Sequence, residues 1–96
     1  MKRGRCKNRP LNTLKEVTKL TTLKEALRLV GVLNRDTTVH IIPIEKAEQK
    51  YIYGKVLSMK EVKDTYDLKR TMCHRIDYDC FNDGQFLYWE FYVDER

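Results

Sequence analysis

Cysteine and histidine side chains near the end of the chain are the first candidates for chemistry, because thiolate sulfur and imidazole nitrogen are ligands that zinc prefers. Cys73 and His74 are adjacent, and Cys80 lies six residues after His74. In a strand, adjacent side chains point to opposite faces, and residues six apart are separated by about 20 Å. His74 and Cys80 are therefore too far apart to share an ion. We expect no metal site and no cofactor.

Three carboxylates in the same region, Asp77, Asp79 and Glu90, are the next candidates. Neighbouring carboxylates shift each other's pKa values, and such pairs serve as general acid and general base. The chain supplies no nucleophile motif beside them. Its glycines are isolated, so no glycine-rich loop is available to bind phosphate. We expect no catalytic residues and no enzymatic activity.

The excess positive charge of the chain lies in its first nine residues. The chain carries a net charge of +5, and five basic side chains precede Leu11 without an acid among them, so the remainder is formally neutral. Such an arm could bind DNA or RNA phosphates in a salt-sensitive, sequence-independent way. A small nucleic-acid-binding protein is therefore the alternative function, and a solvated tail is the other interpretation. The basic residues are Lys2, Arg3, Arg5, Lys7 and Arg9.

Length and composition predict one small domain of 96 residues with 42% hydrophobic content. Residues 1–10 show no apolar periodicity and end in Pro10, so we predict a disordered basic arm over 1–10 and a single α+β domain over 11–96. No apolar run is long enough for a membrane span or a signal peptide, which predicts a cytoplasmic protein. Three cysteines form no disulfide framework and are expected to be reduced.

Apolar spacing predicts a first helix that begins after Thr22, where Thr22 and Glu25 form a capping-box signature and Gly31 is placed to end the helix. A related segment at 13–20 is expected to be a short helix or an irregular turn. Strands over 38–44 and 50–57 are predicted to pair as a hairpin through a 45–49 connection.

Proline at position 43 lacks the N–H that a ladder needs, so the 38–44 strand is expected at a sheet edge. Ser58 and Glu61 repeat the capping box and predict a short helix over 59–67. Two further strands, 71–81 and 85–93, are joined at Asp83-Gly84, the dipeptide typical of a two-residue hairpin loop.

The register that follows from this loop places apolar partners on one face, including Tyr78 with Trp89 and Ile76 with Phe91. It also pairs Cys80 with Leu87 and His74 with Val93. The predicted fold is therefore α+β: an N-terminal helix, a β-hairpin, a short helix and a C-terminal β-hairpin that together form a four-stranded antiparallel sheet. The predicted core comprises Leu23, Ala26, Leu27, Val30, Val39, Ile41, Ile52, Val56, Ile76, Tyr78, Leu87, Trp89, Phe91 and Val93.

The other face of the C-terminal hairpin alternates acids with aromatic residues, and we call it the acidic–aromatic face. Exposed aromatic side chains among charges are typical of protein interfaces. Three interpretations stay open: a solvated or covered face, a binding surface for a basic partner protein, or self-association of a monomer into a homodimer. The candidate partner-binding residues are Asp77, Asp79, Phe81, Phe86, Tyr88, Glu90 and Tyr92.

Several short motifs from Thr22 onward resemble those of a known group of proteins. They are the opening T-L-K-E-A-L, the segment Asp36-Thr-Thr-Val-His-Ile41, the segment Tyr53-Gly-Lys-Val56 and the final strand rich in acids and aromatics. In these features, about three quarters of the chain resembles small, mostly uncharacterised accessory proteins of phages and mobile elements of Firmicutes. The resemblance implies a small accessory protein of a mobile element, a class in which anti-CRISPR and other anti-defence inhibitors are common. With the acidic–aromatic face, this predicts a non-enzymatic inhibitor in the host cytoplasm that occludes a host protein through that face.

Overall fold

The computed structural model describes residues 20–94 of the chain. The predicted arm at 1–10, with Lys2, Arg3, Arg5, Lys7 and Arg9, lies outside the described residues, as does most of the 13–20 repeat. Within 20–94, no helix is long and apolar enough to cross a membrane. The elements in chain order are β1 (Thr21–Thr22), α1 (Leu23–Leu29), β2 (Thr38–Pro43), the 3₁₀ segment η2 (Ile44–Gln49), α2 (Lys50–Tyr53), β3 (Lys55–Ser58), α3 (Met59–Thr65), β4 (Met72–Cys80) and β5 (Phe86–Val93).

The strands form one five-stranded sheet in the order β1-β4-β5-β2-β3. The two hairpins meet through β2 and β5, which run parallel, whereas the other neighbours are antiparallel. The α+β prediction is confirmed, but the four-stranded antiparallel sheet is wrong. The expectation of an edge position for β2 is also wrong, because Pro43 is the last residue of the strand and the missing N–H interrupts little of the ladder.

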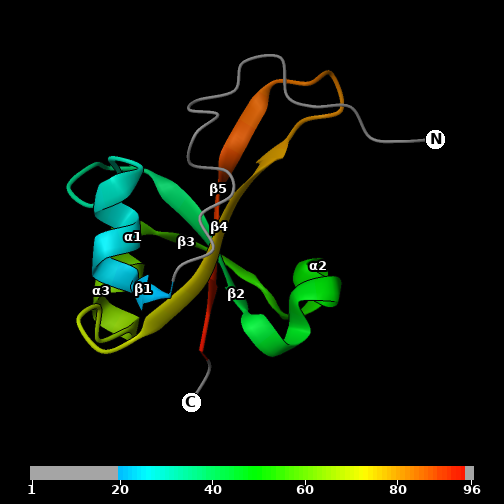
Figure 1. Ribbon diagram of the computed structural model, residues 1–96. Helices are drawn as coiled ribbons and strands as arrows, with labels where there is room; N and C mark the ends of the chain where they lie inside the picture. Colours follow the sequence, from blue (N-terminus) through cyan, green and yellow to red (C-terminus); the bar gives the residue numbers. More distant parts are fainter. Residues whose placement is uncertain (1–19, 95–96) are drawn as a thin grey trace.

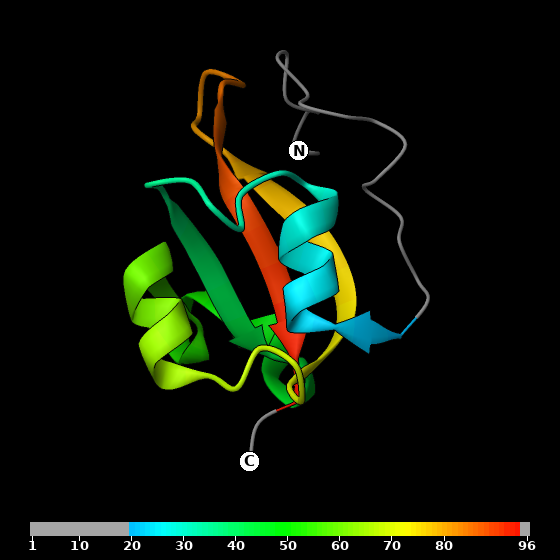
Figure 2. The ribbon, with the colours of Figure 1, turned by 90° about the vertical axis from the view of Figure 1, so that its left-hand side faces the viewer.

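Helices cover both faces of this sheet. Figures 1 and 2 show α1 and α3 on one face, with η2 and α2 on the opposite face.

The Thr22 hydroxyl accepts from Glu25 N–H at 3.1 Å, and Gly31 follows α1 with a φ of +81°, which glycine adopts without strain. Ser58 and Glu61 form both bonds of the predicted capping box at the start of α3. Local sequence signals therefore place both helices correctly.

The apolar core lies between the sheet and the α1–α3 layer. Most predicted core residues are buried there, while Val30, Tyr78 and Leu87 are half-buried. Ile52 and Val56 were predicted in the core, but their exposed fractions are 72% and 49%. Residues 50–53 form a helix in place of the first half of the predicted strand, so Ile52 points away from the core. The buried core cluster is Leu23, Ala26, Leu27, Val32, Val39, Ile41, Met59, Val62, Cys73, Ile76, Trp89, Phe91 and Val93.

The middle of the C-terminal hairpin has the predicted register. Tyr78 pairs with Trp89 and Ile76 with Phe91. Near the open end, the predicted pairing of His74 with Val93 is wrong, because a bulge between Cys73 and Arg75 places Cys73 opposite Val93 instead.

Near the loop, the predicted pairing of Cys80 with Leu87 is also wrong, since Cys80 lies opposite Phe86. The loop is longer than two residues, because Phe81 N–H donates to Gln85 O at 2.8 Å. The resulting bulge turns Phe86 onto the core face, where its ring lies 5.5 Å from that of Trp89. Figure 1 shows this end of the hairpin extending beyond the helical layers.

Candidate functional site

The acidic–aromatic face is largely covered by η2 and α2. Asp79, Glu90 and Tyr92 are buried, so the expectation that they are exposed to a partner is wrong. Phe86 lies on the opposite face of the sheet, and Phe81 is exposed on the loop. The physical reason is the unexpected α2, whose side chains reach the sheet and pair with its carboxylates.

A row of side chains crosses four strands beneath this cover. Val56, His40, Glu90 and Asp77 are direct partners across β3, β2, β5 and β4, and partners in register point to the same face. The charged members of this row lie on central strands. A carboxylate in that position needs a partner, because an unpaired buried charge is strongly destabilising.

Glu90 obtains its partners from α2 and from its own strand. The Lys50 Nζ lies 2.9 Å from Glu90 Oε2, and the Tyr92 hydroxyl donates to Glu90 Oε1 at 3.1 Å. Burial by itself would raise the pKa of Glu90, but the neighbouring His40 and Lys50 side chains hold that pKa below its ordinary value of 4.5. The buried carboxyl is therefore ionised at neutral pH.

His40 is buried beside this ion pair. Its Nε2–H donates to the Lys50 carbonyl at 3.2 Å, and its ring meets the Tyr88 ring edge-on at 5.4 Å. Its Nδ1 lies 3.7 Å from Glu90 Oε2 and has no hydrogen-bond partner. A Cβ on Gly54 would lie 2.4 Å from His40 Nε2, so only glycine allows the chain to turn from α2 into β3 this close to the ring.

A second bond fixes α2 to the neighbouring strand. The Tyr51 hydroxyl donates to Asp79 Oδ2 at 2.7 Å, and Asp79 Oδ1 accepts the Cys80 N–H at 2.8 Å. Burial raises the pKa of the Tyr88 phenol, and the charges of Asp79 and Glu90 raise it further. The polar cluster thus holds α2 to β5 through Lys50 and to β4 through Tyr51.

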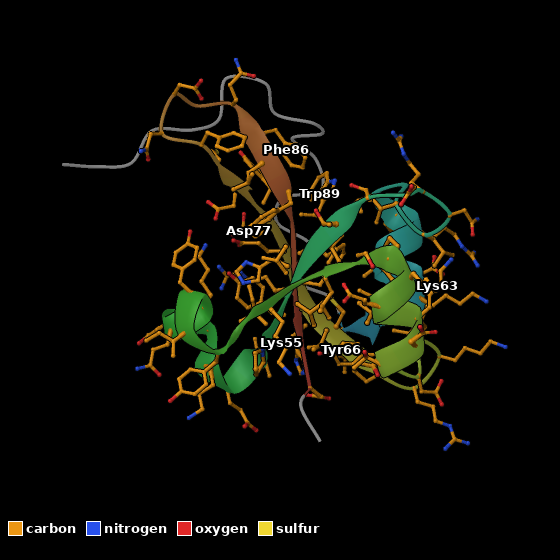
Figure 3. The ribbon with its side chains drawn as sticks, turned by 180° about the vertical axis from the view of Figure 1, so that it is seen from behind. Lys55, Lys63, Tyr66, Asp77, Phe86 and Trp89 are labelled. Atoms are coloured by element: carbon orange, nitrogen blue, oxygen red, sulfur yellow. The ribbon has the colours of Figure 1, made fainter. Side chains whose placement is uncertain are left out.

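The outer side of α2 exposes large apolar side chains. The exposed fractions of Tyr51, Ile52 and Tyr53 are 65%, 72% and 45%, and half-exposed Val56 follows on β3. The Lys46 ammonium lies 4.8 Å from the centroid of the Tyr53 ring. We call Tyr51, Ile52, Tyr53 and Val56 the α2 surface. Figure 3 shows α2 on the opposite side of the sheet from α3, which carries the labelled Lys63.

Sequence reasoning missed this surface because 50–57 is rich in β-branched and aromatic residues, a composition typical of strands. The available signal was Gly54, which interrupts the predicted strand. A second signal was the placement of Asp77 opposite Glu90 in the predicted register, since facing carboxylates call for a nearby cation.

The cysteines do not form a metal site in the part of the chain that the structure covers. No group of three His, Cys, Asp or Glu side chains within 20–94 could hold an ion. Cys73 is buried and free, and burial raises the pKa of its thiol to about 11. Cys80 is disulfide-bonded, so the expectation of a reduced thiol is wrong there, and Cys6 lies outside the described residues. His74 instead contacts Asp94 at 2.6 Å.

The site therefore has two layers: a buried polar cluster that positions α2, and the exposed α2 surface above it. Comparison with models of protein families, with curated proteins and with solved structures finds no match to this chain.

Proposed function

We propose that this protein is a non-enzymatic protein-binding protein that contacts its partner through the α2 surface. The observation that carries the proposal is the exposure of three consecutive large side chains, Tyr51, Ile52 and Tyr53, at 65%, 72% and 45%. Tyrosine is enriched among the residues that dominate binding energy at protein interfaces.

The buried cluster supports this proposal because it holds the α2 surface in place before any partner arrives. Lys50 and Tyr51 tie α2 to Glu90 and Asp79. A surface held in one conformation loses less entropy on association than a mobile one. The same bonds explain the buried carboxylates as positioning residues, without any need for acid–base chemistry.

The adjacent strand extends the same surface. β3 is an edge strand, and its residues Lys55 and Val56 are exposed. An edge strand offers unpaired backbone groups to an extended segment of a partner. We therefore expect the partner protein to contact both the aromatic side chains of α2 and the edge strand β3.

The mode of action in this proposal is occlusion of a partner surface, as in an inhibitor or accessory protein. The resemblance to phage and mobile-element accessory proteins supports a host protein as the partner, with an anti-CRISPR or other anti-defence role in the host cytoplasm. The contact residues differ from the seven of the acidic–aromatic face, because α2 covers most of that face. Self-association into a homodimer is an outcome that the experiment distinguishes.

The test places a photo-crosslinking amino acid, p-benzoylphenylalanine, at position 52 of the full chain. A matched control carries it at Leu29, which is exposed on α1 at the opposite face of the sheet. We expect a crosslinked host protein at position 52, absent at position 29 and reduced when Tyr53→Ala is added. Equal crosslinking at both positions, or a dimer of the chain as the sole product, would overturn the proposal.

A further inference from the structure

The segment formed by η2 and α2, residues 44–53, contributes no buried residue to the molecule. Its described bonds to the sheet are polar: Lys50 with Glu90, Tyr51 with Asp79, and the Lys50 carbonyl with His40. A segment that buries few apolar side chains opens locally at a lower free energy than the core. The bonds hold this cover in place in the folded state, but its local opening costs less free energy than unfolding of the core.

Displacement of this segment uncovers a face of defined chemistry, which we call the anionic face. Three carboxylates lie there against one guanidinium, so the uncovered face attracts a cation. Two phenol rings and the apolar Ile42 flank the charges, so an aromatic neighbour beside that cation also fits. The polar members are Arg75, Asp77, Asp79, Tyr88, Glu90 and Tyr92.

Two residues of α2, Lys50 and Tyr51, already bind this face in the way that an external basic and aromatic ligand would. Lys50 places its ammonium on Glu90 while the next residue, Tyr51, bonds Asp79. The Lys50 Nζ also lies 5.1 Å from the centroid of the Tyr51 ring. A basic residue followed by an aromatic residue thus occupies both carboxylates at once.

The internal occupant leaves one group unsatisfied. His40 Nδ1 is buried without a hydrogen-bond partner, 3.7 Å from Glu90 Oε2. In the neutral ring whose Nε2–H donates to the Lys50 carbonyl, Nδ1 is an acceptor, and leaving a buried acceptor unpaired is unfavourable. A guanidinium has five N–H donors in a planar fork, so it can donate to two acceptors this far apart, whereas the Lys50 ammonium bonds only the carboxylate. Arginine therefore matches this pair of acceptors better than Lys50 does.

We propose that the anionic face is a docking site for an arginine-bearing segment of a partner protein, and that residues 44–53 occupy this site in the absence of the partner. Tyr51 takes part in both sites, because its hydroxyl bonds Asp79, whereas Ile52 and Tyr53 are exposed on α2. Binding at the anionic face displaces α2, whereas binding at the α2 surface retains it. The two proposals therefore fail independently.

The first experiment uses hydrogen exchange of the unmodified full chain. Backbone amides of 44–54 are expected to exchange at least about tenfold faster than those of β5, because they open without global unfolding. The probe is a synthetic peptide with the sequence of residues 44–53 carrying Lys50→Arg, used at about 1 mM to match the effective concentration of a tethered segment. It should accelerate exchange of 44–54 further, and a Lys50→Met peptide should not.

Two results of that experiment overturn the proposal. One is exchange of 44–54 at the same rate as β5, which means that the segment leaves the sheet only on global unfolding. The other is an equal effect of the two peptides, which means that the guanidinium is not recognised.

The second experiment weakens the internal occupant. The Lys50→Met chain should bind the arginine peptide at least tenfold more tightly than the unmodified chain, measured with a fluorescent label on the peptide. Lys46→Met is the matched control, because Lys46 is exposed on the same segment and contacts Tyr53 instead of the sheet. Equal affinity of the two variants for the peptide overturns the proposal. If the Lys50→Met variant does not fold, the hydrogen-exchange experiment on the unmodified chain tests the proposal by itself.

Discussion

The Lys50 ammonium and the Glu90 carboxylate, forty residues apart in the chain, lie 2.9 Å apart beneath α2. Glu90 is fully buried, whereas Lys50 reaches it from a helix with no buried residue. This ion pair joins the exposed helix to a central strand, and together with the bond from Tyr51 to Asp79 it fixes the position of the α2 surface.

Removal of the Lys50 charge should strongly destabilise the protein. Lys50→Met leaves the buried Glu90 carboxylate without its ammonium partner, and breaking a buried pair in this way lowers the free energy of unfolding by about 3–5 kcal/mol. The Lys50→Arg variant keeps the charge and can also donate to His40 Nδ1, so it should be at least as stable as the unmodified protein. Chemical denaturation measures the free energy of unfolding of both variants. If Lys50→Met lowers it by less than about 1 kcal/mol, the ion pair contributes little to stability.

Acid should weaken the fold through Glu90. Its folded-state pKa lies below the ordinary value of 4.5, so the carboxylate stabilises the folded state above that pH. This contribution disappears as the pH falls from 4.5 through the folded-state pKa. Thermal melts between pH 7 and pH 3 should show a drop in Tm below about pH 4.5. Tyr92→Phe removes a hydroxyl donor to Glu90 and should make that drop smaller, and an unchanged pH profile would exclude Glu90 as its source.

Gly54 should not tolerate a side chain. A Cβ there would lie 2.4 Å from His40 Nε2 and 2.5 Å from the Lys50 carbonyl oxygen, so Gly54→Ala must displace α2 or the imidazole. Overpacking of this kind typically reduces stability by about 1–3 kcal/mol. In a His40→Ala background one of the two clashes is absent, so Gly54→Ala should cost less stability there than in the unmodified protein. An unchanged Tm in Gly54→Ala would contradict the close approach of Gly54 to His40 and the Lys50 carbonyl.

Two isoleucines that sequence analysis placed in the core should respond differently to truncation. Ile41 is buried in the core cluster, and Ile41→Ala should reduce stability by about 2–5 kcal/mol. Ile52 is exposed on α2, and Ile52→Ala should change stability by no more than about 0.5 kcal/mol. Urea denaturation of both variants makes the comparison. A large loss in Ile52→Ala would place that residue in the core, as the sequence suggested.

The alternative function, nucleic-acid binding, is tested by the charge of the first nine residues. A variant with all five basic residues of the arm replaced by Gln removes that charge from the full chain. If the arm binds phosphates, a gel shift with DNA or RNA weakens steeply as salt rises and is lost in the variant. A shift of equal strength in the variant would exclude the arm, and no shift with either protein would exclude this function. The variant is Lys2→Gln, Arg3→Gln, Arg5→Gln, Lys7→Gln and Arg9→Gln.

The sequence alone determined the local structure of this protein. Capping residues Thr22 and Ser58 set the starts of both long helices, because a hydroxyl at an N-cap satisfies a nearby backbone N–H without help from the rest of the chain. The alternation of apolar residues set the register at the centre of the C-terminal hairpin, because a slip of one residue would turn Tyr78 and Trp89 to the wrong face.

Only the tertiary structure decided the sheet order and the site. The parallel contact of β2 with β5 places His40 opposite Glu90, and no local pattern in either segment specifies that partner. Residues 50–53 form a helix because Lys50 and Tyr51 find the carboxylates of two distant strands there, which outweighs the strand preference of their composition. Long-range pairing of charges therefore buried a face that the sequence alone presented as exposed, and it placed the exposed aromatic residues on the helix that covers that face.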